Sequence, residues 1–290
     1  MFEIVSCVIK NNEKTILFIV DIGVVGFEDV LLFKSNRAKN IGIFEDGMIS
    51  VAAGLALKGF IPIIYGISPF ILCRAFEQLK LDFSYQKLGG NFITTGASYD
   101  MSTLGYSHYC PEDLGLIKMI PDFQFIAPGT PTQFASLFKH TYDNGKPTYF
   151  RLSDYSNNTD VSVTFGKATI CKSGTQATII VVGTMLDLVI NSCKDLDVTI
   201  LYYTTLVPFD SETLKYNCPS NKVLLCEPNY SVLSKDVIDA LAPYPVMISY
   251  VSVKEDIDML RNYGTKREKD NLHGITEDCI RKKALHLIRA

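Results

Sequence analysis

A glutamate stands at the start of a strongly apolar segment. Glu45 is followed by Asp46 and Gly47, and within residues 48–57 only Ser50 has a polar side chain. A segment that is apolar all round predicts a buried helix. A carboxylate at the start of such a helix can complement the positive end of the helix dipole, or it can be a functional group of a site. The residues alone leave both interpretations open.

Three other side chains could also carry chemistry. Asp21 follows an apolar strand candidate, at the end of the strand where α/β domains commonly present functional groups. His108 lies in a polar loop, and Arg151 ends another predicted strand. Each has a structural alternative: Asp21 can cap a turn, His108 can be a surface residue, and Arg151 can pair with Asp154 or another carboxylate.

The cysteines give no metal or disulfide signal. They form no Cys-x-x-Cys motif and have no close histidine, which predicts neither a zinc site nor a disulfide framework. We therefore expect free or buried thiols in a reducing compartment. The eight positions are 7, 73, 110, 171, 193, 218, 226 and 279.

Length and composition narrow the class of protein. The chain has 290 residues, 47% hydrophobic and 20% charged, which is enough for about two packed domains and excludes overall disorder. With 28 Lys and Arg against 31 Asp and Glu, the net charge of −3 argues against a nucleic-acid partner. The longest apolar stretches, 16–27 and 60–72, fall short of the roughly 20 residues that a membrane span needs. No secretory signal is recognisable, so we expect a cytoplasmic protein without a membrane partner.

Elements that would position these side chains follow the pattern of parallel βαβ units. Short β-rich runs alternate with helix-like stretches, so the expected fold class is α/β, with mostly parallel sheets flanked by helices. In the first half we expect strands at 15–20, 40–43, 61–65, 91–94, 123–126 and 148–151, and helices at 46–58, 69–82, 111–119 and 131–143.

A polar segment at 153–160 is the best linker in the sequence. It divides the chain into an expected domain at 1–155 and a smaller α/β domain at 160–290. In the second domain we expect strands at 178–182, 197–201, 222–226 and 246–251, and helices at 185–193, 231–241 and 275–288.

Residues 40–57 resemble the pyrimidine-binding domain of the transketolase family. The match includes a Gly-Ile-x-Glu core that contains Glu45, a Met three residues later, and the helix Ala-Ala-Gly-Leu-Ala. The resemblance continues at 74–78, Gly105, His108, 120–122, 127–128 and 145–148, and then into the family's C-terminal domain. It implies a pyrimidine-binding domain followed by a transketolase C-terminal domain.

For Glu45 the resemblance implies contact with N1′ of the pyrimidine of thiamine diphosphate. A carboxyl group that shares a proton with N1′ favours the imino tautomer, whose nitrogen can take the proton from thiazolium C2. Desolvation in a closed apolar site would favour this proton-sharing state more than the helix terminus would oppose it. The resemblance thus makes Glu45 both a catalytic and a cofactor-binding residue.

The same resemblance assigns further cofactor-binding residues. It places Asp21 near the cofactor. It also places a stacking loop at 65–70, in which Phe70 is the first choice for the aromatic face against the pyrimidine and Tyr65 the second. Because most phenylalanines lie in the core, Phe70 can equally be a core residue.

Substrate binding is implied for two residues. His108 stands where the family has Asp-Gly-Pro-Thr-His, which makes it a catalytic residue, a hydrogen-bond donor or proton carrier for substrate oxygens. Arg151 matches an arginine that binds substrate phosphate in the related deoxyxylulose-phosphate synthases. The family's acidic residue is replaced by Leu104, and Ala97 and Asp154 stand where arginines are common. We therefore expect an unusual donor or a modified acceptor.

The family's diphosphate-binding domain has no counterpart here. No Gly-Asp-Gly motif occurs in the sequence, and no cluster of oxygen ligands with suitable spacing for magnesium is apparent. The resemblance thus implies a separate protein chain that binds the diphosphate and Mg²⁺, and an α2β2 assembly in which this chain also pairs with its own copy.

Three functions remain open. The first is transfer of a two-carbon ketol unit between sugars. The second is decarboxylation of a 2-oxo acid, as in deoxyxylulose-phosphate synthases and the β subunits of 2-oxo acid dehydrogenases. The third is a non-catalytic role in assembly.

Overall fold

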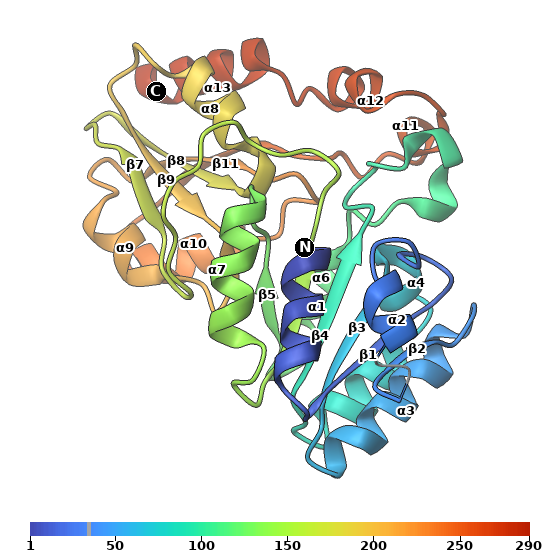
Figure 1. Cartoon of the computed structure of the whole chain (residues 1–290). Helices are drawn as coiled ribbons and strands as arrows, with labels where there is room; N and C mark the ends of the chain where they lie inside the picture. The colour runs from blue at the N-terminus through green and yellow to red at the C-terminus, as the bar shows by residue number, and fades with distance from the viewer. Residues whose placement is uncertain (34–35) are drawn as a thin grey trace.

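Two β-sheets, each flanked by helices, make up the chain (Figure 1). The structure is a computed structural model and describes residues 1–33 and 36–290. Most strand pairs in both sheets are parallel, so the predicted α/β class is confirmed.

The first sheet has the strand order β10-β5-β6-β4-β3-β1-β2, and only β10 runs antiparallel to its neighbour. Its strands are β1 (Thr15–Ile19), β2 (Ala38–Asn40), β3 (Ile61–Ile67), β4 (Gly90–Thr95), β5 (Gln124–Ile126), β6 (Pro147–Arg151) and β10 (Thr205–Val207). Every residue of β1, β4 and β6 is buried, which explains their nearly continuous apolar and β-branched sequences.

The second sheet has the order β12-β11-β8-β9-β7, with β7 antiparallel at one edge. Its strands are β7 (Thr169–Lys172), β8 (Ala177–Val182), β9 (Val198–Tyr203), β11 (Lys222–Cys226) and β12 (Met247–Val251). Because β10 comes from the second half of the sequence but pairs with β5, the two halves are joined through a sheet as well as through the loop at 152–168.

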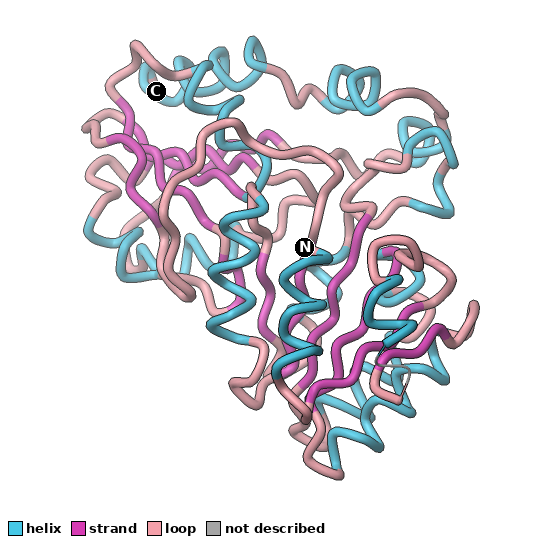
Figure 2. Tube along the Cα trace, in the orientation of Figure 1, coloured by secondary structure: helices cyan, strands magenta, loops and turns pink. Residues whose placement is uncertain are grey.

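The helices of the first half are α1 (Phe2–Asn11), α2 (Glu28–Phe33), α3 (Glu45–Leu57), α4 (Ser68–Leu72), α5 (Phe76–Gln78), α6 (Asp113–Lys118) and α7 (Pro131–Thr141). Those of the second half are α8 (Leu186–Ser192), α9 (Ser211–Tyr216), α10 (Ser234–Leu241), α11 (Ile257–Arg261), α12 (Lys266–His273) and α13 (Glu277–Arg289). Figure 2 shows how these helices surround the strands. None of them, over the described residues, is long and apolar enough to cross a bilayer.

Alternate residues of β1 face two different cores, as the two-residue repeat of a strand requires. Leu17 and Ile19 pack with residues of α1, α2 and α7. Ile16 and Phe18 pack with residues of α3, α4 and α6, and this core continues into the second sheet. The first sheet is therefore covered on both faces, and its edges remain for a site.

Several predicted elements differ from the observed ones. The strand expected at 40–43 lies at Ala38–Asn40, and the helix expected at 69–82 is divided into α4, α5 and a π-helical turn at Leu79–Ser84. The chain turns after α4, where the Arg74 N–H bonds to the Pro69 carbonyl five residues earlier. The helices α1, α2, α9, α11 and α12 and the short strands β7 and β10 were not expected from the sequence.

Helix α3 is not buried all round, so that expectation was wrong. Met48, Ile49, Ala52 and Ala53 face the core, whereas the opposite face is exposed. On that face the Val51 side chain is 51% exposed in this chain. An apolar sequence indicated burial, but it could not show that one face lacks cover within the chain.

Candidate functional site

The predicted residues of the first half follow the carboxyl ends of parallel strands. Asp21 follows β1, Glu45 follows β2, Phe70 follows β3, and the loop after β4 carries His108. From β1 the chain passes to β2 on one side and then returns to β3 on the other side. Such a reversal in strand order is where open α/β sheets commonly bind ligands.

Glu45 is the first residue of α3, and its side chain is only 2% exposed. Its Oε2 lies 2.5 Å from Nη1 of Arg74, and among the described residues this is the one hydrogen bond to the Glu45 side chain. The carboxylate thus has both the positive end of a helix and a guanidinium beside it. Its protonated or proton-sharing state stays a prediction.

Arg74 links Glu45 to two of the other predicted residues. The guanidinium carbon of Arg74 lies 4.5 Å from the centre of the Phe70 ring, within the range of a cation–π contact. The Phe70 ring in turn meets the His108 ring edge to face, with 5.2 Å between the ring centres. We call Glu45, Arg74, Phe70 and His108 the Glu45 cluster.

A short 3₁₀ turn, Tyr106–His108, carries His108 into this cluster. The turn starts after Gly105, whose φ of +85° favours glycine, and a Cβ there would lie 2.6 Å from the ring of Tyr263. His108 Nδ1 lies 3.0 Å from Oγ of Ser107. The His108 loop is thus braced by the segment after α11, which reaches back to it from the C-terminal part of the chain (Figure 1).

Asp21 and Tyr65 lie outside the Glu45 cluster. Asp21 is exposed, and Asn40 bonds to both its N–H (3.0 Å) and its carboxylate (2.9 Å), so this pair joins the ends of β1 and β2. Tyr65 is buried, and its ring packs edge to face with Phe2 and Phe27. Burial raises the pKa of Tyr65 to about 12. This packing favours Phe70 over Tyr65 as the aromatic side chain available to a ligand.

Arg151 is buried and has partners within the protein. Its Nε donates to Oδ2 of the buried Asp113 at 2.6 Å, and its Nη2 donates to Ser98 Oγ and, at 3.2 Å, to the Pro228 carbonyl. Burial raises the pKa of Asp113, and the Arg151 charge opposes that shift. The ion pair that the sequence offered as an alternative role therefore forms with Asp113, not with Asp154. Phosphate binding by Arg151 stays a prediction.

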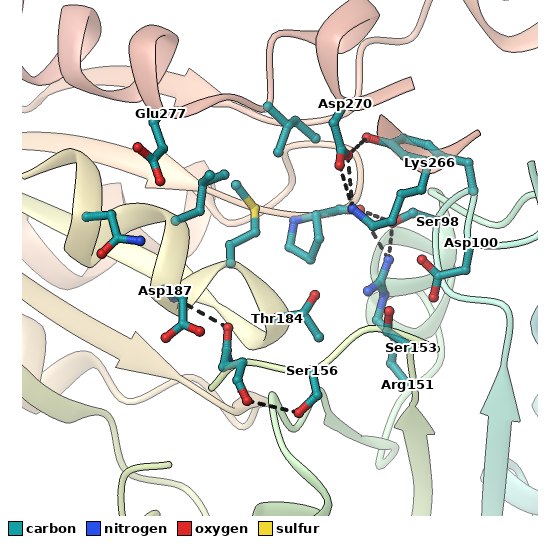
Figure 3. Close-up of a pocket in the computed structure, with 17 residues that line it drawn as sticks. Ser98, Asp100, Arg151, Ser153, Ser156, Thr184, Asp187, Lys266, Asp270 and Glu277 are labelled. Carbon is teal, nitrogen blue, oxygen red and sulfur yellow. Dashed lines mark hydrogen bonds and ion pairs between the residues drawn. The ribbon is translucent and has the colours of Figure 1, made fainter. Parts of the chain in front are cut away.

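Arg151 also borders a polar cavity of about 320 Å³ that lies between the two halves of the chain (Figure 3). Charged side chains around it are Asp100, Arg151, Asp187, Lys266, Asp270 and Glu277. Lys266 Nζ lies 2.8 Å from Asp270, and burial raises the pKa of Asp100 to about 6. Since carboxyl groups outnumber cations, the cavity is poorly suited to a diphosphate.

Possible metal ligands converge at one place in the described part of the chain. Cys73 Sγ, Cys110 Sγ and a carboxylate oxygen of Glu112 lie within 4.8 Å of one another. Magnesium prefers a shell of oxygen ligands, so two sulfur atoms make this group unsuitable for Mg²⁺. The described residues thus provide no magnesium site of their own.

Two important partners were missed by sequence reasoning. Arg74 lies in the segment 74–78 that resembles the family, so its position was visible but its contact with Glu45 was not. Asp113 had no signal at all, because its pairing with Arg151 joins residues 38 positions apart.

Comparison with known proteins places this architecture among related chains. Residues 15–157 match the family described as "Transketolase, pyrimidine binding domain". An "Uncharacterized 33.6 kDa protein in fasciation locus" of Rhodococcoides fascians is 33% identical, over 93% of this chain and 88% of that protein. One of the chains named for an apulose-4-phosphate transketolase in Actinobacillus succinogenes is 24% identical, over 87% of this chain and 85% of that protein. A solved structure, "Split gene transketolase, inactive beta4 tetramer", shares the fold with a TM-score of 0.88 and 24% identity, over 99% of this chain and 96% of that one.

Proposed function

Because this chain belongs to the transketolase family and corresponds to its C-terminal half, we propose that it is one subunit of a two-chain, thiamine diphosphate-dependent enzyme. The reaction we propose is transfer of a two-carbon ketol unit between sugar substrates. The observation that carries the proposal is the buried Glu45 at the carboxyl edge of the first sheet, with Phe70 and His108 in the same cluster. In this proposal, residues 1–155 are the pyrimidine-binding domain and residues 160–290 the C-terminal domain.

The residues present fit the pyrimidine end of the cofactor. Glu45 offers a carboxyl group for N1′, fixed by its place at the start of α3 and by Arg74. Phe70 is half-buried, and because Arg74 lies over its ring, the pyrimidine would stack on the opposite face. Asp21 lies at the end of the adjoining strand β1 and would border the same site.

Each residue of this chain has a defined task in the proposed mechanism. Thiamine diphosphate, when bound, supplies the nucleophilic carbon and the electron sink for the reaction. Glu45 shares a proton with N1′ and thereby sets the tautomer of the pyrimidine amino group. His108 donates a hydrogen bond or a proton to substrate oxygens, and Arg74 holds the Glu45 carboxylate and the Phe70 ring in place.

A second, different chain is proposed to hold the diphosphate and its Mg²⁺. Two features support this: the described residues offer no oxygen-rich metal site, and α3 exposes an apolar face next to Glu45. Around the start of α3, Ile43 and Phe44 are exposed as well as Val51. A partner that covered this surface would also close the site above Glu45 and exclude water. We propose an α2β2 assembly.

Titration calorimetry with thiamine diphosphate and Mg²⁺ tests this proposal. The purified chain should bind the cofactor more weakly than micromolar, and addition of the diphosphate-binding subunit should produce tight binding and turnover. Micromolar binding by the isolated chain would overturn the two-chain assignment.

Decarboxylation of a 2-oxo acid is the second candidate, and Leu104 is the observation that favours it. Leu104 is 54% exposed, four residues before His108, where it cannot accept a hydrogen bond from a donor hydroxyl. The reconstituted complex should be assayed with pyruvate for release of CO₂ and, in parallel, with ketose phosphates for ketol transfer. CO₂ release without ketol transfer would favour the second candidate. The absence of both reactions in a complex that binds the cofactor would favour an assembly role.

A further inference from the structure

Two cysteines distant in the sequence meet beside the Glu45 cluster. Cys73 directly follows α4, and Cys110 follows the turn that carries His108. Their sulfur atoms and a carboxylate oxygen of Glu112 all lie within 4.8 Å of one another. The three side chains thus form a compact group of two soft ligands and one oxygen ligand.

The spacing of this group suits a tetrahedral ion. Cys73 Sγ lies 3.5 Å from Glu112 Oε1. With zinc–sulfur and zinc–oxygen bonds of about 2.3 and 2.0 Å, tetrahedral geometry puts sulfur and oxygen about 3.5 Å apart. A thiol–carboxylate hydrogen bond can have the same length, so this distance alone does not establish a metal site.

A second observation concerns the other carboxylate oxygen. Glu112 Oε2 is buried, and within the described part of the chain it has no hydrogen-bond partner. A buried acceptor without a partner is unfavourable, and a bound cation would satisfy the carboxylate. Cys110 is fully buried, whereas Cys73 is exposed, so the group is open to solvent on one side only.

The backbone around these ligands is already fixed. Cys110 N–H donates to the Ser98 carbonyl at 2.8 Å, and the Pro111 carbonyl accepts from Tyr230 N–H at 2.8 Å. On the other side, Leu72 of α4 is completely buried next to Cys73. The ligands are therefore presented by segments that need little rearrangement to bind an ion.

We propose that Cys73, Cys110 and Glu112 bind one zinc ion, with a water molecule as the fourth ligand on the Cys73 side. Thiolate ligands select zinc over magnesium and calcium. Binding replaces the two thiol protons, which are released to solvent, and involves no oxidation. Because Cys73 precedes Arg74 and Cys110 lies two residues after His108, the ion would connect the two segments that form the Glu45 cluster.

Cobalt titration of the reduced, full-length chain tests this site without cofactor or partner. We expect one Co²⁺ per chain, with a thiolate-to-cobalt charge-transfer band and the intense visible bands of tetrahedral cobalt, all removed by Zn²⁺. Cys73→Ser should weaken binding by about a hundredfold or more, and Glu112→Gln by about tenfold or more. Cys7→Ser is the matched control, because Cys7 is an exposed thiol on α1, and it should bind like the wild type.

Since Cys73 is exposed, its substitution should leave the fold intact, which circular dichroism can verify. Equal affinity of the wild type and Cys73→Ser would overturn the proposal. A spectrum without the charge-transfer band would do so too, as would loss of two free thiols to a disulfide in a protein that binds no metal after reduction. None of these results depends on whether the chain takes part in ketol transfer.

Discussion

Glu45 is the residue on which the proposed chemistry depends. Glu45→Gln keeps the size of the side chain but cannot share a proton with N1′ in the same way. We expect the chain to fold and to associate with its partner, while turnover of the reconstituted complex falls by about 10²- to 10⁴-fold. Asp46→Asn, which removes the adjacent exposed carboxylate, should stay within about threefold of the wild type. A similar small effect of Glu45→Gln would leave Glu45 with only the role of complementing the helix dipole.

Arg151 has changed its meaning between sequence and structure. A substrate-binding arginine, as the sequence suggests, could be replaced with a loss of catalysis and no loss of fold. In the structure, Arg151→Met would leave Asp113 buried and without its cation. We therefore expect the free energy of unfolding to fall by about 3–5 kcal/mol, measured by urea denaturation.

The double variant Arg151→Met, Asp113→Leu should recover much of that loss, because it removes both buried charges. If Arg151→Met alone lowered the free energy of unfolding by less than about 1 kcal/mol, the ion pair would not be important for stability. The guanidinium would then be a better candidate for phosphate binding.

At the scale of elements, the exposed face of α3 is the surface that the proposed partner should cover. Val51→Glu places a charge there and should weaken association with the diphosphate-binding subunit at least about tenfold, because an interface would have to desolvate the new carboxylate. Ile238→Glu on α10 is the matched control, since both side chains are 51% exposed. Sedimentation velocity at several concentrations measures the effect. Equal association of the two variants would place the partner elsewhere.

Elements were predictable where local sequence determines them. The apolar, β-branched segment 177–182 forms a strand almost as expected, and so does the segment 15–19. Strand β10 has three residues and exists because it pairs with β5, so its own sequence carries little signal. The break after α4 likewise depends on where Arg74 finds its partner.

Across the whole molecule, the same division applies to the candidate site. Glu45, Phe70 and His108 could be predicted because they lie in motifs with a recognisable order, and the structure brings them together through Arg74. The meeting of Cys73 and Cys110 could not be predicted. Their wide separation in the sequence matches no metal-ligand spacing, and only the folded chain brings the two thiols together.

The two halves of the molecule meet at a segment that should make stability depend on pH. Directly after β11, Glu227 is fully buried and accepts a hydrogen bond from Ser231 Oγ at 2.7 Å. The next residues contact the first half: the Pro228 carbonyl accepts from Arg151, and Tyr230 N–H donates to Pro111. Burial raises the pKa of Glu227 from 4.5 to about 7.

A raised carboxyl pKa means that the folded chain holds a proton that the unfolded chain has already lost. Below about pH 4.5 both states are protonated and Glu227 causes no loss of stability; between about pH 4.5 and 7, stability falls as the pH rises, and above about pH 7 the loss is complete. A shift of this size corresponds to roughly 3 kcal/mol. Glu227→Gln should abolish this dependence, because an amide does not ionise.

Urea denaturation of the wild type and of Glu227→Gln at a series of pH values isolates the effect of Glu227, since all other titrating groups cancel in the difference. We expect the wild type to lose roughly 3 kcal/mol relative to the variant between about pH 4.5 and 7.5. Glu212→Gln, at an exposed carboxylate on α9, is the control and should follow the wild type at every pH. Parallel curves for the wild type and Glu227→Gln would show that Glu227 ionises in the folded chain as readily as in the unfolded one. The contact between the two halves would then have to tolerate a buried negative charge.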